Sequence, residues 1–137
     1  MLYFGKIKHY KSVFKTKTFD RWAKKVISDP LLCTAAREIE QGLYEADLGH
    51  GVCKKRIAVP GQGKSASTRT LLAKRHPAAI VFLVGREKNE PGPDFPDVVV
   101  TAAKAIADDL HHQTIERLDA LAADGKLKEI CNAQKDP

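Results

Sequence analysis

The chain has 137 residues, of which 43% are hydrophobic and 29% charged, and its formal net charge at pH 7 is +6. This length suits one globular domain that folds without a disulfide or a metal, and no apolar run approaches the roughly 18 residues of a membrane span. The opening MLYFGKIKHYK is too basic for a secretory leader. A membrane protein, a multidomain enzyme and a secreted disulfide scaffold are excluded. The odd number and wide spacing of Cys33, Cys53 and Cys131 predict reduced thiols in the cytoplasm.

Acidic and basic residues are segregated along the chain. Residues 1–29 carry a net charge of +6, residues 30–52 of −3, residues 53–90 of +7 and residues 91–137 of −4. A +7 segment within the predicted sheet favours a polyanionic partner, because clustered cations attract phosphates. A merely solvated basic face is the alternative that charge alone leaves open.

The first third of the chain predicts one strand followed by a helical hairpin. Residues 12–17 alternate between apolar and polar side chains, as a strand does. Thr18 is expected to cap a helix that begins at Phe19. The Ser-Asp-Pro at 28–30 predicts the start of a second helix, and Gly42 its end.

The rest of the chain predicts three strands and then two helices. The strands are expected at residues 52–59, 65–75 and 78–84, after an LGHG loop at 48–51 and on both sides of a PGQG turn at 60–63. The continuous apolar run at 78–84 suits a buried central strand. A proline-rich loop at 89–96 leads to a helix at 97–112 and to another that begins at Gln113 or Thr114. The apolar face of the first of these helices is assigned to Val99, Ala102, Ala103, Ile106 and Leu110.

Successive strands joined by short turns, with helices before and after them, predict an α+β domain. We expect a small, twisted antiparallel sheet with an N-terminal helical hairpin and C-terminal helices.

Several cations are expected to converge on one face of this sheet. Lys54 and Arg56 lie two apart on a strand and therefore share a face, whereas Lys55 points to the other face with Cys53 and Ile57. Arg69 reaches the same region if its strand pairs back as a hairpin. Arg86 and Lys88 follow the end of the next strand. The set contains neither a carboxylate partner nor a nucleophile, so it predicts a phosphate-binding face, with or without chemistry.

The stretch AVPGQGKS at 58–65 fits a relaxed phosphate-loop pattern but lacks its context. The apolar strand that follows ends without a magnesium-binding aspartate, and too few residues remain for a parallel nucleotide-binding fold. A nucleotide-binding P-loop is therefore the least favoured interpretation, and a hairpin turn the more favoured. No small-molecule cofactor is expected.

The five histidines do not predict a metal site. His111 and His112 are adjacent and so face different directions on a helix, and no His or Cys pair has zinc-ligand spacing. There is also no G-x-S-x-G sequence for a serine nucleophile. No metal is expected.

The stretch KKRIAVPGQGKSASTRTLLAKR, preceded by GLYEADLGHGV, resembles the core of the RelE-like toxins of bacterial type II toxin–antitoxin systems. The segments VFKTKTFDRWAKK and LDALAADGKLKEI resemble the beginning and the end of the same family. The likeness covers about residues 12–131, and PGQGKS followed by Arg-Thr is its most specific part. It implies a single toxin domain at 12–131, with an N-terminal extension at 1–11 and a C-terminal tail at 132–137.

This resemblance implies a RelE/ParE-type fold and a metal-independent toxin that cuts mRNA on the ribosome and stops translation. It implies a cognate helix-turn-helix antitoxin, the ribosome and mRNA as partners, and no membrane. The implied catalytic residues are Lys54, Arg56, Arg69 and Lys88, with Lys54 or Lys88 as proton acceptor and the arginines on the scissile phosphate. Further RNA contacts are assigned to Lys64, Lys74, Arg75 and Arg86.

The alternative is a non-catalytic protein of the same fold that only binds an antitoxin or nucleic acid. Thr68 favours it, because the family usually has a tyrosine before the motif arginine. Relatives of this fold also poison gyrase, so the fold alone does not establish the activity.

Overall fold

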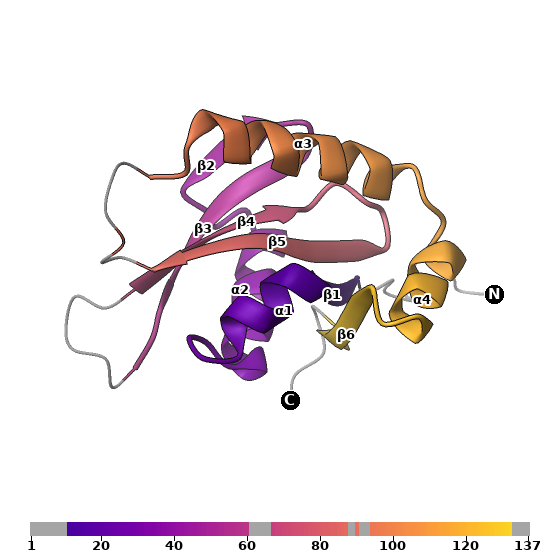
Figure 1. The fold of residues 1–137 in the computed structure, drawn as a ribbon, viewed down its shortest axis with the longest axis horizontal. Coiled ribbons are helices and arrows are strands. Elements are labelled where there is room, and N and C mark those ends of the chain that lie inside the picture. Colours follow the sequence, from indigo (N-terminus) through magenta and orange to yellow (C-terminus); the bar gives the residue numbers. More distant parts are fainter. Residues whose placement is uncertain (1–10, 61–66, 88–89, 91–93, 133–137) are drawn as a thin grey trace.

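The structure is a computed structural model that describes residues 11–60, 67–87, 90 and 94–132. These residues form six strands and four helices, with two helices after the first strand and two before the last (Figure 1). In chain order they are β1 (Ser12–Thr16), α1 (Lys17–Ala23), α2 (Asp29–Glu40), β2 (Ala46–Gly49), β3 (Val52–Ala58), β4 (Ser67–Ala73), β5 (Ala79–Glu87), α3 (Asp97–His111), α4 (Ile115–Ala123) and β6 (Leu127–Asn132).

The strands form one open sheet in the order β2-β3-β4-β5-β1-β6. The central position predicted for the apolar run of β5 is confirmed. The sheet is mixed rather than purely antiparallel, because β1 pairs in parallel with β5 through Ser12–Ala79 to Lys15–Phe82. The crossover through the helical hairpin and the meander places β1 on the far side of β5 and allows this direction.

Both edge strands, β2 and β6, were absent from the sequence prediction. The segment that was assigned to the loop at 48–51 instead forms the end of β2, and the tight turn to β3 contains His50 at φ 55° and Gly51 at φ 75°. β6 has the sequence LKEICN, whose charged residues hide its alternation. Edge strands are short and polar because one side of each is solvated, so they give a weak periodic signal.

Two helical layers cover opposite faces of the sheet. α1 and α2 pack on one face and α3 and α4 on the other, as their positions in Figure 1 indicate. Because successive side chains of a strand point to opposite faces of the sheet, the buried residues form two separate core layers. The layer under α1 and α2 includes Phe19, Leu32, Cys53, Leu72 and Phe82. The layer under α3 and α4 includes Phe14, Leu71, Val81, Ala103 and Leu118.

The helices begin and end close to where the sequence predicts, with one correction. Thr16, rather than Thr18, caps α1, because its hydroxyl accepts a 3.1 Å hydrogen bond from the Phe19 backbone N–H. Thr114 caps α4 in the same way. Gly42, at φ 86°, follows the end of α2 as expected.

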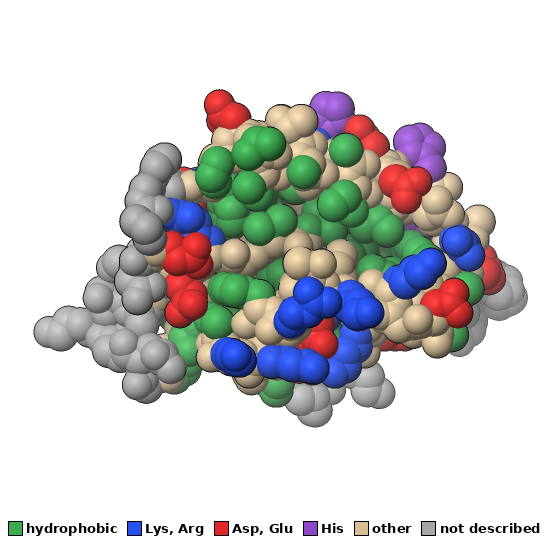
Figure 2. All heavy atoms as spheres, viewed as in Figure 1, with side chains coloured by type: hydrophobic (Ala, Val, Ile, Leu, Met, Phe, Trp, Pro, Cys, Tyr) green, Lys and Arg blue, Asp and Glu red, His purple; other side chains and the backbone are tan. Residues whose placement is uncertain are grey.

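The buried face of α3 differs from the predicted one. Ala103, Ala107 and Leu110 are buried, whereas Ala102 is exposed and Ile106 is 47% exposed. Figure 2 shows hydrophobic side chains gathered over α3. Nine of the fifteen residues of α3 are apolar, so they span a wider arc of the helix than the buried stripe and the periodicity did not select the buried residues among them.

A β-bulge in β5 redirects the end of that strand. Leu72 pairs with Phe82 but Leu71 pairs with Val84, so Leu83 is the extra residue. Alternation is therefore reset, and Gly85 faces α1 while Arg86 faces the α3 side. Trp22 occupies the space over Gly85, where a Cβ would come within 2.0 Å of Trp22 Cζ3.

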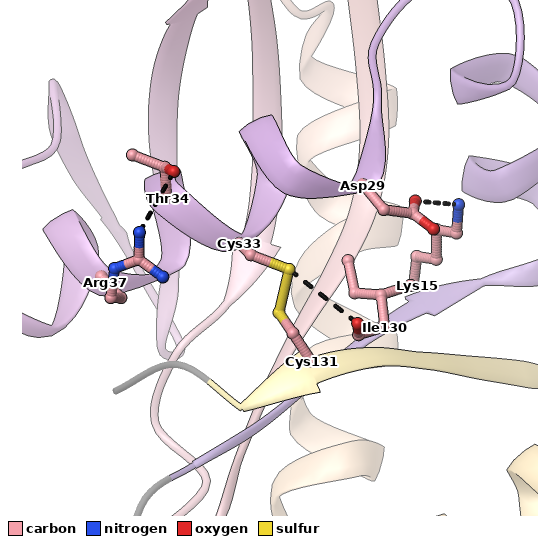
Figure 3. The surroundings of a disulfide bond; sticks show 7 residues. All are labelled: Lys15, Asp29, Cys33, Thr34, Arg37, Ile130 and Cys131. Carbon is pink, nitrogen blue, oxygen red and sulfur yellow. Dashed lines mark hydrogen bonds and ion pairs between the residues drawn. A yellow bond between two sulfur atoms is a disulfide. The ribbon is translucent and has the colours of Figure 1, made fainter. Parts of the chain in front are cut away.

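Cys33 of α2 and Cys131 of β6 form a disulfide (Figure 3). The expectation that all three cysteines are unpaired is wrong for these two, although they are 98 residues apart in sequence. The pairing depends on β6, which sequence periodicity did not predict. Cys53 is free and buried, and burial raises the pKa of its thiol to about 12.

Candidate functional site

Three arginines form a row across three neighbouring strands at one end of the sheet. Arg56 of β3 pairs in register with Arg69 of β4, which pairs in register with Arg86 of β5. Directly opposite residues on one sheet face have Cβ atoms about 4.5–5.5 Å apart, so the three side chains leave the same face as neighbours. This arginine row (Arg56, Arg69 and Arg86) stands beside the layer that α3 covers. The bulge in β5 is what places Arg86 in it.

Lys54 joins the arginine row through a shared carboxylate. Its Nζ hydrogen-bonds to Oδ2 of Asp94, and Nη1 of Arg69 lies 3.3 Å from Oδ1 of the same side chain. The side chains of Lys54, Arg69 and Asp94 are 28%, 19% and 36% exposed. The site is therefore partly desolvated but open to solvent.

No pattern in the sequence pointed to Asp94 as a member of this site. It was assigned to a proline-rich loop, and the cations were expected to lack a carboxylate partner. Asp94 lies 40 residues from Lys54 and 25 from Arg69, and it precedes Phe95, which packs against the α3-side core, and Pro96, the N-cap of α3. The packing of Phe95 and the start of α3 thus positions the Asp94 carboxylate at the site.

The electrostatics of Asp94 follow from its two partners. Partial burial acts to raise the pKa of its carboxyl, but the hydrogen bonds and charges of Lys54 and Arg69 outweigh burial, and the net pKa lies below the ordinary value of 3.8. Asp94 is therefore a carboxylate at neutral pH.

Two further acidic residues moderate the repulsion within the arginine row. Glu90 Oε1 lies 3.6 Å from Arg86 Nη1, and the Glu90 carbonyl accepts a 3.2 Å hydrogen bond from Arg86 Nη2. Glu45 accepts a 2.6 Å hydrogen bond from the backbone N–H of Arg56. These interactions stabilise the cluster of like charges. Arg56 remains exposed, whereas the Arg86 side chain is 11% exposed.

The arrangement can bind an anion at one place. Arg69 has five N–H donors, and its Nε is buried without a hydrogen-bond partner among the described residues. Guanidinium groups pair with phosphate oxygens in a forked geometry. A phosphate over the row would meet Lys54 and the three arginines at once.

The structure brings only part of the predicted site together. Lys54, Arg56, Arg69 and Arg86 share one surface, whereas Lys64 and Lys88 lie outside the described residues. Lys74 and Arg75 follow the end of β4, five and six residues from Arg69, so their backbone is roughly 17–20 Å away along the strand direction.

Lys74 and Arg75 have other surroundings. The ammonium of Lys74 lies 3.5 Å from Asp47 Oδ2 and 5.2 Å from the centre of the Tyr44 ring. The backbone N–H of Arg75 donates to Nε2 of His111. The predicted strand at 65–75 was too long, because β4 ends at Ala73.

Strand alternation is confirmed on β3, where Lys55 points away from the arginine row. Lys55 is buried on the α2 side, pairs with Glu38 at 2.8 Å and donates to the Leu43 carbonyl at 2.9 Å. Lys54 and Lys55 are therefore neighbours in sequence with separate roles.

The histidines form no metal centre within the described residues, where no group of three His, Cys, Asp or Glu side chains converges. His76 is buried and contacts the Gln113 carbonyl at 2.7 Å. Burial first, and the charge of Arg75 next, lower the pKa of His111 to about 4.

Residues 11–130 match the family model described as the RelE toxin of the RelE/RelB toxin–antitoxin system. The chain belongs to the RelE toxin family, and its α+β fold is consistent with that family. It is a toxin of a toxin–antitoxin system, and RelE toxins pair with antitoxins. A comparison with curated proteins found no match. Along the described residues, no helix is both long and apolar enough to cross a membrane.

Proposed function

We propose that this toxin is a metal-independent endoribonuclease that cuts mRNA on the ribosome and thereby stops translation. The observation that carries this proposal is the convergence of Lys54 with the arginine row on one partly exposed sheet surface. The row supplies positive charge where an RNA backbone would develop negative charge during cleavage.

The chemistry uses the substrate's own nucleophile. The 2′-oxygen of a ribose attacks the adjacent phosphorus, the bond from phosphorus to the 5′-oxygen breaks, and the proton of the 2′-hydroxyl passes to a base. Arg56 and Arg69 hold the phosphate oxygens and stabilise the added charge, with Arg86 as a further RNA contact. Lys54 or Lys88, in its neutral amine form, accepts the proton of the 2′-hydroxyl, and the departing 5′-oxygen takes a proton from water.

The proposal extends to the partners and to the setting. The toxin domain covers residues 12–131 and acts in the cytoplasm, and its antitoxin is a helix-turn-helix protein. An acidic segment of such an antitoxin would neutralise the arginine row by covering it. The Cys33–Cys131 disulfide lies on the α2 side of the sheet, away from the row, so the site does not depend on it directly.

Induced expression of the chain without an antitoxin tests the toxicity. Growth and protein synthesis should stop, and primer extension on cellular mRNA should show new 5′ ends only in translated regions. Unimpaired growth with soluble, folded protein would contradict the proposal.

The non-catalytic alternative rests on Thr68 in place of the usual tyrosine, and the position of Thr68 in the sheet weakens that argument. Thr68 is 3% exposed, and its hydroxyl lies 3.4 Å from the Ile57 carbonyl, on the face opposite the arginine row. A side chain at this position does not reach RNA on the row. The two hypotheses separate in a purified translation system, where only the enzyme shortens the mRNA.

Binding of RNA through its phosphates can be recognised from the salt dependence of the affinity. The affinity for RNA should fall steeply with salt, with a log–log slope of about −0.7 per neutralised phosphate of a single strand. The double variant Lys54→Ala, Arg56→Ala should flatten this slope by about one contact or more. A salt-independent affinity would exclude the row as the RNA-binding surface.

A further inference from the structure

One carboxylate occupies the centre of the cationic site. Asp94 spreads its two oxygens over two cations of the proposed RNA site, Oδ2 to Lys54, a candidate proton acceptor, and Oδ1 to Arg69, which the proposed function places on the phosphate. Carboxylate and phosphate oxygens use the same donors of lysine and arginine. A phosphate that enters between Lys54 and Arg69 must therefore displace the carboxylate.

We propose that Asp94 is an internal competitor of the RNA phosphate, which holds Lys54 and Arg69 together in the free toxin and weakens RNA binding until RNA displaces it. This inference deepens the proposed function and rests on it for the identity of the ligand. It assigns to Asp94 the role of setting the affinity of the site rather than a role in the chemical step.

The surroundings of Asp94 make this exchange feasible. The carboxylate is 36% exposed, so the displaced group has solvent to move into. Its contacts with the two cations lower the pKa of Asp94, so it stays ionised near neutral pH and is removed by competition rather than by protonation. Of the three acidic partners of the site, Asp94 alone contacts two of the cationic side chains, whereas Glu90 pairs with Arg86 and Glu45 contacts a backbone N–H among the described residues.

The arrangement resembles a counter-ion built into the loop before α3. With Asp94 in place, Lys54 and Arg69 together carry one net positive charge instead of two. Removal of that carboxylate leaves both donors free for one phosphate, without changing the strands that position them.

The test compares Asp94→Asn with Asp97→Asn in the full chain. Asp97 is exposed in the first turn of α3, so its variant makes the same change in net charge three residues away. The probe is a single-stranded RNA with 2′-O-methyl riboses, which the toxin cannot cut, and the readout is fluorescence anisotropy at several salt concentrations.

We expect Asp94→Asn to lower the dissociation constant for RNA about tenfold relative to Asp97→Asn. A change of this size is of the order of one partly screened interaction between two charges. Its salt slope should steepen by about 0.7, equal to one more phosphate contact. Asp94→Glu keeps the charge and should show no such gain. Equal affinities of Asp94→Asn and Asp97→Asn, or weaker binding by Asp94→Asn, would overturn the inference.

The failure of the proposed function would look different. If the wild-type toxin neither cuts mRNA nor stops growth, the enzymatic proposal fails, whereas the binding comparison with uncut RNA still decides the role of Asp94. If the wild-type toxin cuts mRNA and Asp94→Asn gains no affinity, the competitor role alone is wrong.

Discussion

Two lysine clusters on opposite faces of the sheet have opposite charge balances. Lys15 of β1 pairs with two carboxylates, Asp20 at 2.6 Å and Asp29 at 2.7 Å, and its side chain is 4% exposed. Figure 3 shows the contact between Lys15 and Asp29. Lys54 of β3 shares a single carboxylate, Asp94, with Arg69 and is 28% exposed.

The difference separates a structural cluster from a binding one. The Lys15 cluster has one cation for two anions and its lysine is buried, so it presents no net positive charge to a phosphate. The Lys54 site has more cations than anions and lies open to solvent. Charge count and burial, rather than the residue type, thus decide what a lysine in this fold does.

The cluster of exposed cations over α1 and β6 is a third arrangement. Figure 2 shows Lys and Arg side chains gathered there, and the exposed ones in these elements and the loops beside them are Lys17, Arg21, Lys24, Lys25, Lys126 and Lys128. Asp20 lies beneath them, and Lys24 and Lys128 help to lower its pKa after the larger effect of Lys15. These long side chains are solvated, unlike the partly desolvated arginine row.

A large loss of stability is expected from Lys15→Met, which leaves Asp20 and Asp29 facing each other without their cation. The free energy of unfolding should fall by about 3 kcal/mol, the lower end of the usual range because Asp29 is 40% exposed. Urea denaturation measures it. The matched control is Lys17→Met, an exposed lysine two residues on, which should change stability by no more than about 0.5 kcal/mol.

The pH dependence sharpens this prediction. Burial acts to lower the pKa of Lys15, but Asp20 and Asp29 outweigh it and raise that pKa above 10.5, while Lys15 lowers the pKa of Asp20 below 3.8. The stability from Lys15 is therefore complete below pH 10.5 and lost as pH rises through its folded pKa. The part from Asp20 is complete above pH 3.8 and lost as pH falls through its folded pKa. A wild-type advantage over Lys15→Met that keeps growing above pH 10.5 would contradict the cluster.

The disulfide should stabilise the protein by a similar amount. It ties α2, the helix of Asp29, to β6 and closes a loop across 98 residues of sequence. Loop entropy for this length predicts about 4.7 kcal/mol, and measured values are commonly about 2–4 kcal/mol. Reductant should lower the unfolding midpoint of the wild type but not that of Cys131→Ser. Equal midpoints of the wild type with and without reductant would show that the pair is not formed in solution.

Gly85→Ala should destabilise the protein by about 1–3 kcal/mol, as overpacking does, because the new Cβ meets the Trp22 ring. Trp22→Leu provides more room, so the double variant should lose less than the sum of the two single losses. The four unfolding free energies of this cycle measure the coupling. Additive losses would mean that Trp22 does not occupy the space over Gly85.

The sequence predicted the strand and helix cores better than the sheet edges. Long apolar or periodic segments, such as the run at 78–84 and the helix at 97–112, can be predicted from the pattern of their own residues. The short polar strands β2 and β6 form because a neighbour offers them hydrogen bonds, which is a property of the assembled sheet. The disulfide was missed for the same reason, since β6 carries Cys131.

The candidate site was likewise predicted in part: contacts within the β3–β4 hairpin were predicted, whereas those that depend on distant residues or on the bulge were not. Alternation predicted that Lys54 and Arg56 share a face, and a hairpin predicted Arg69 beside them, which the register confirms. The contact with Asp94 depends on packing between residues 25 to 40 positions apart. The position of Arg86 depends on a bulge, which resets the side-chain period at one unmarked residue.

The arginine row should show the smallest effect on stability and the largest on activity. Like charges directly opposite each other on a sheet are unfavourable, and Arg69 stands between Arg56 and Arg86. Arg69→Ala relieves this repulsion, which offsets the lost contact with Asp94, so its unfolding free energy should stay within about 0.5 kcal/mol of the wild type.

The most direct measurement of the central claim is the mRNA cleavage rate of Arg69→Ala in a purified translation system, with its unfolding free energy measured on the same sample. Loss of one preorganised charge donor should slow cleavage about 10²–10³-fold, or about 3–4 kcal/mol, while the protein stays folded. Arg69→Lys should recover little of this rate, because an ammonium cannot reproduce the forked geometry. Normal cleavage by Arg69→Ala, or a loss that accompanies unfolding, would contradict the assignment of the arginine row as the cutting site.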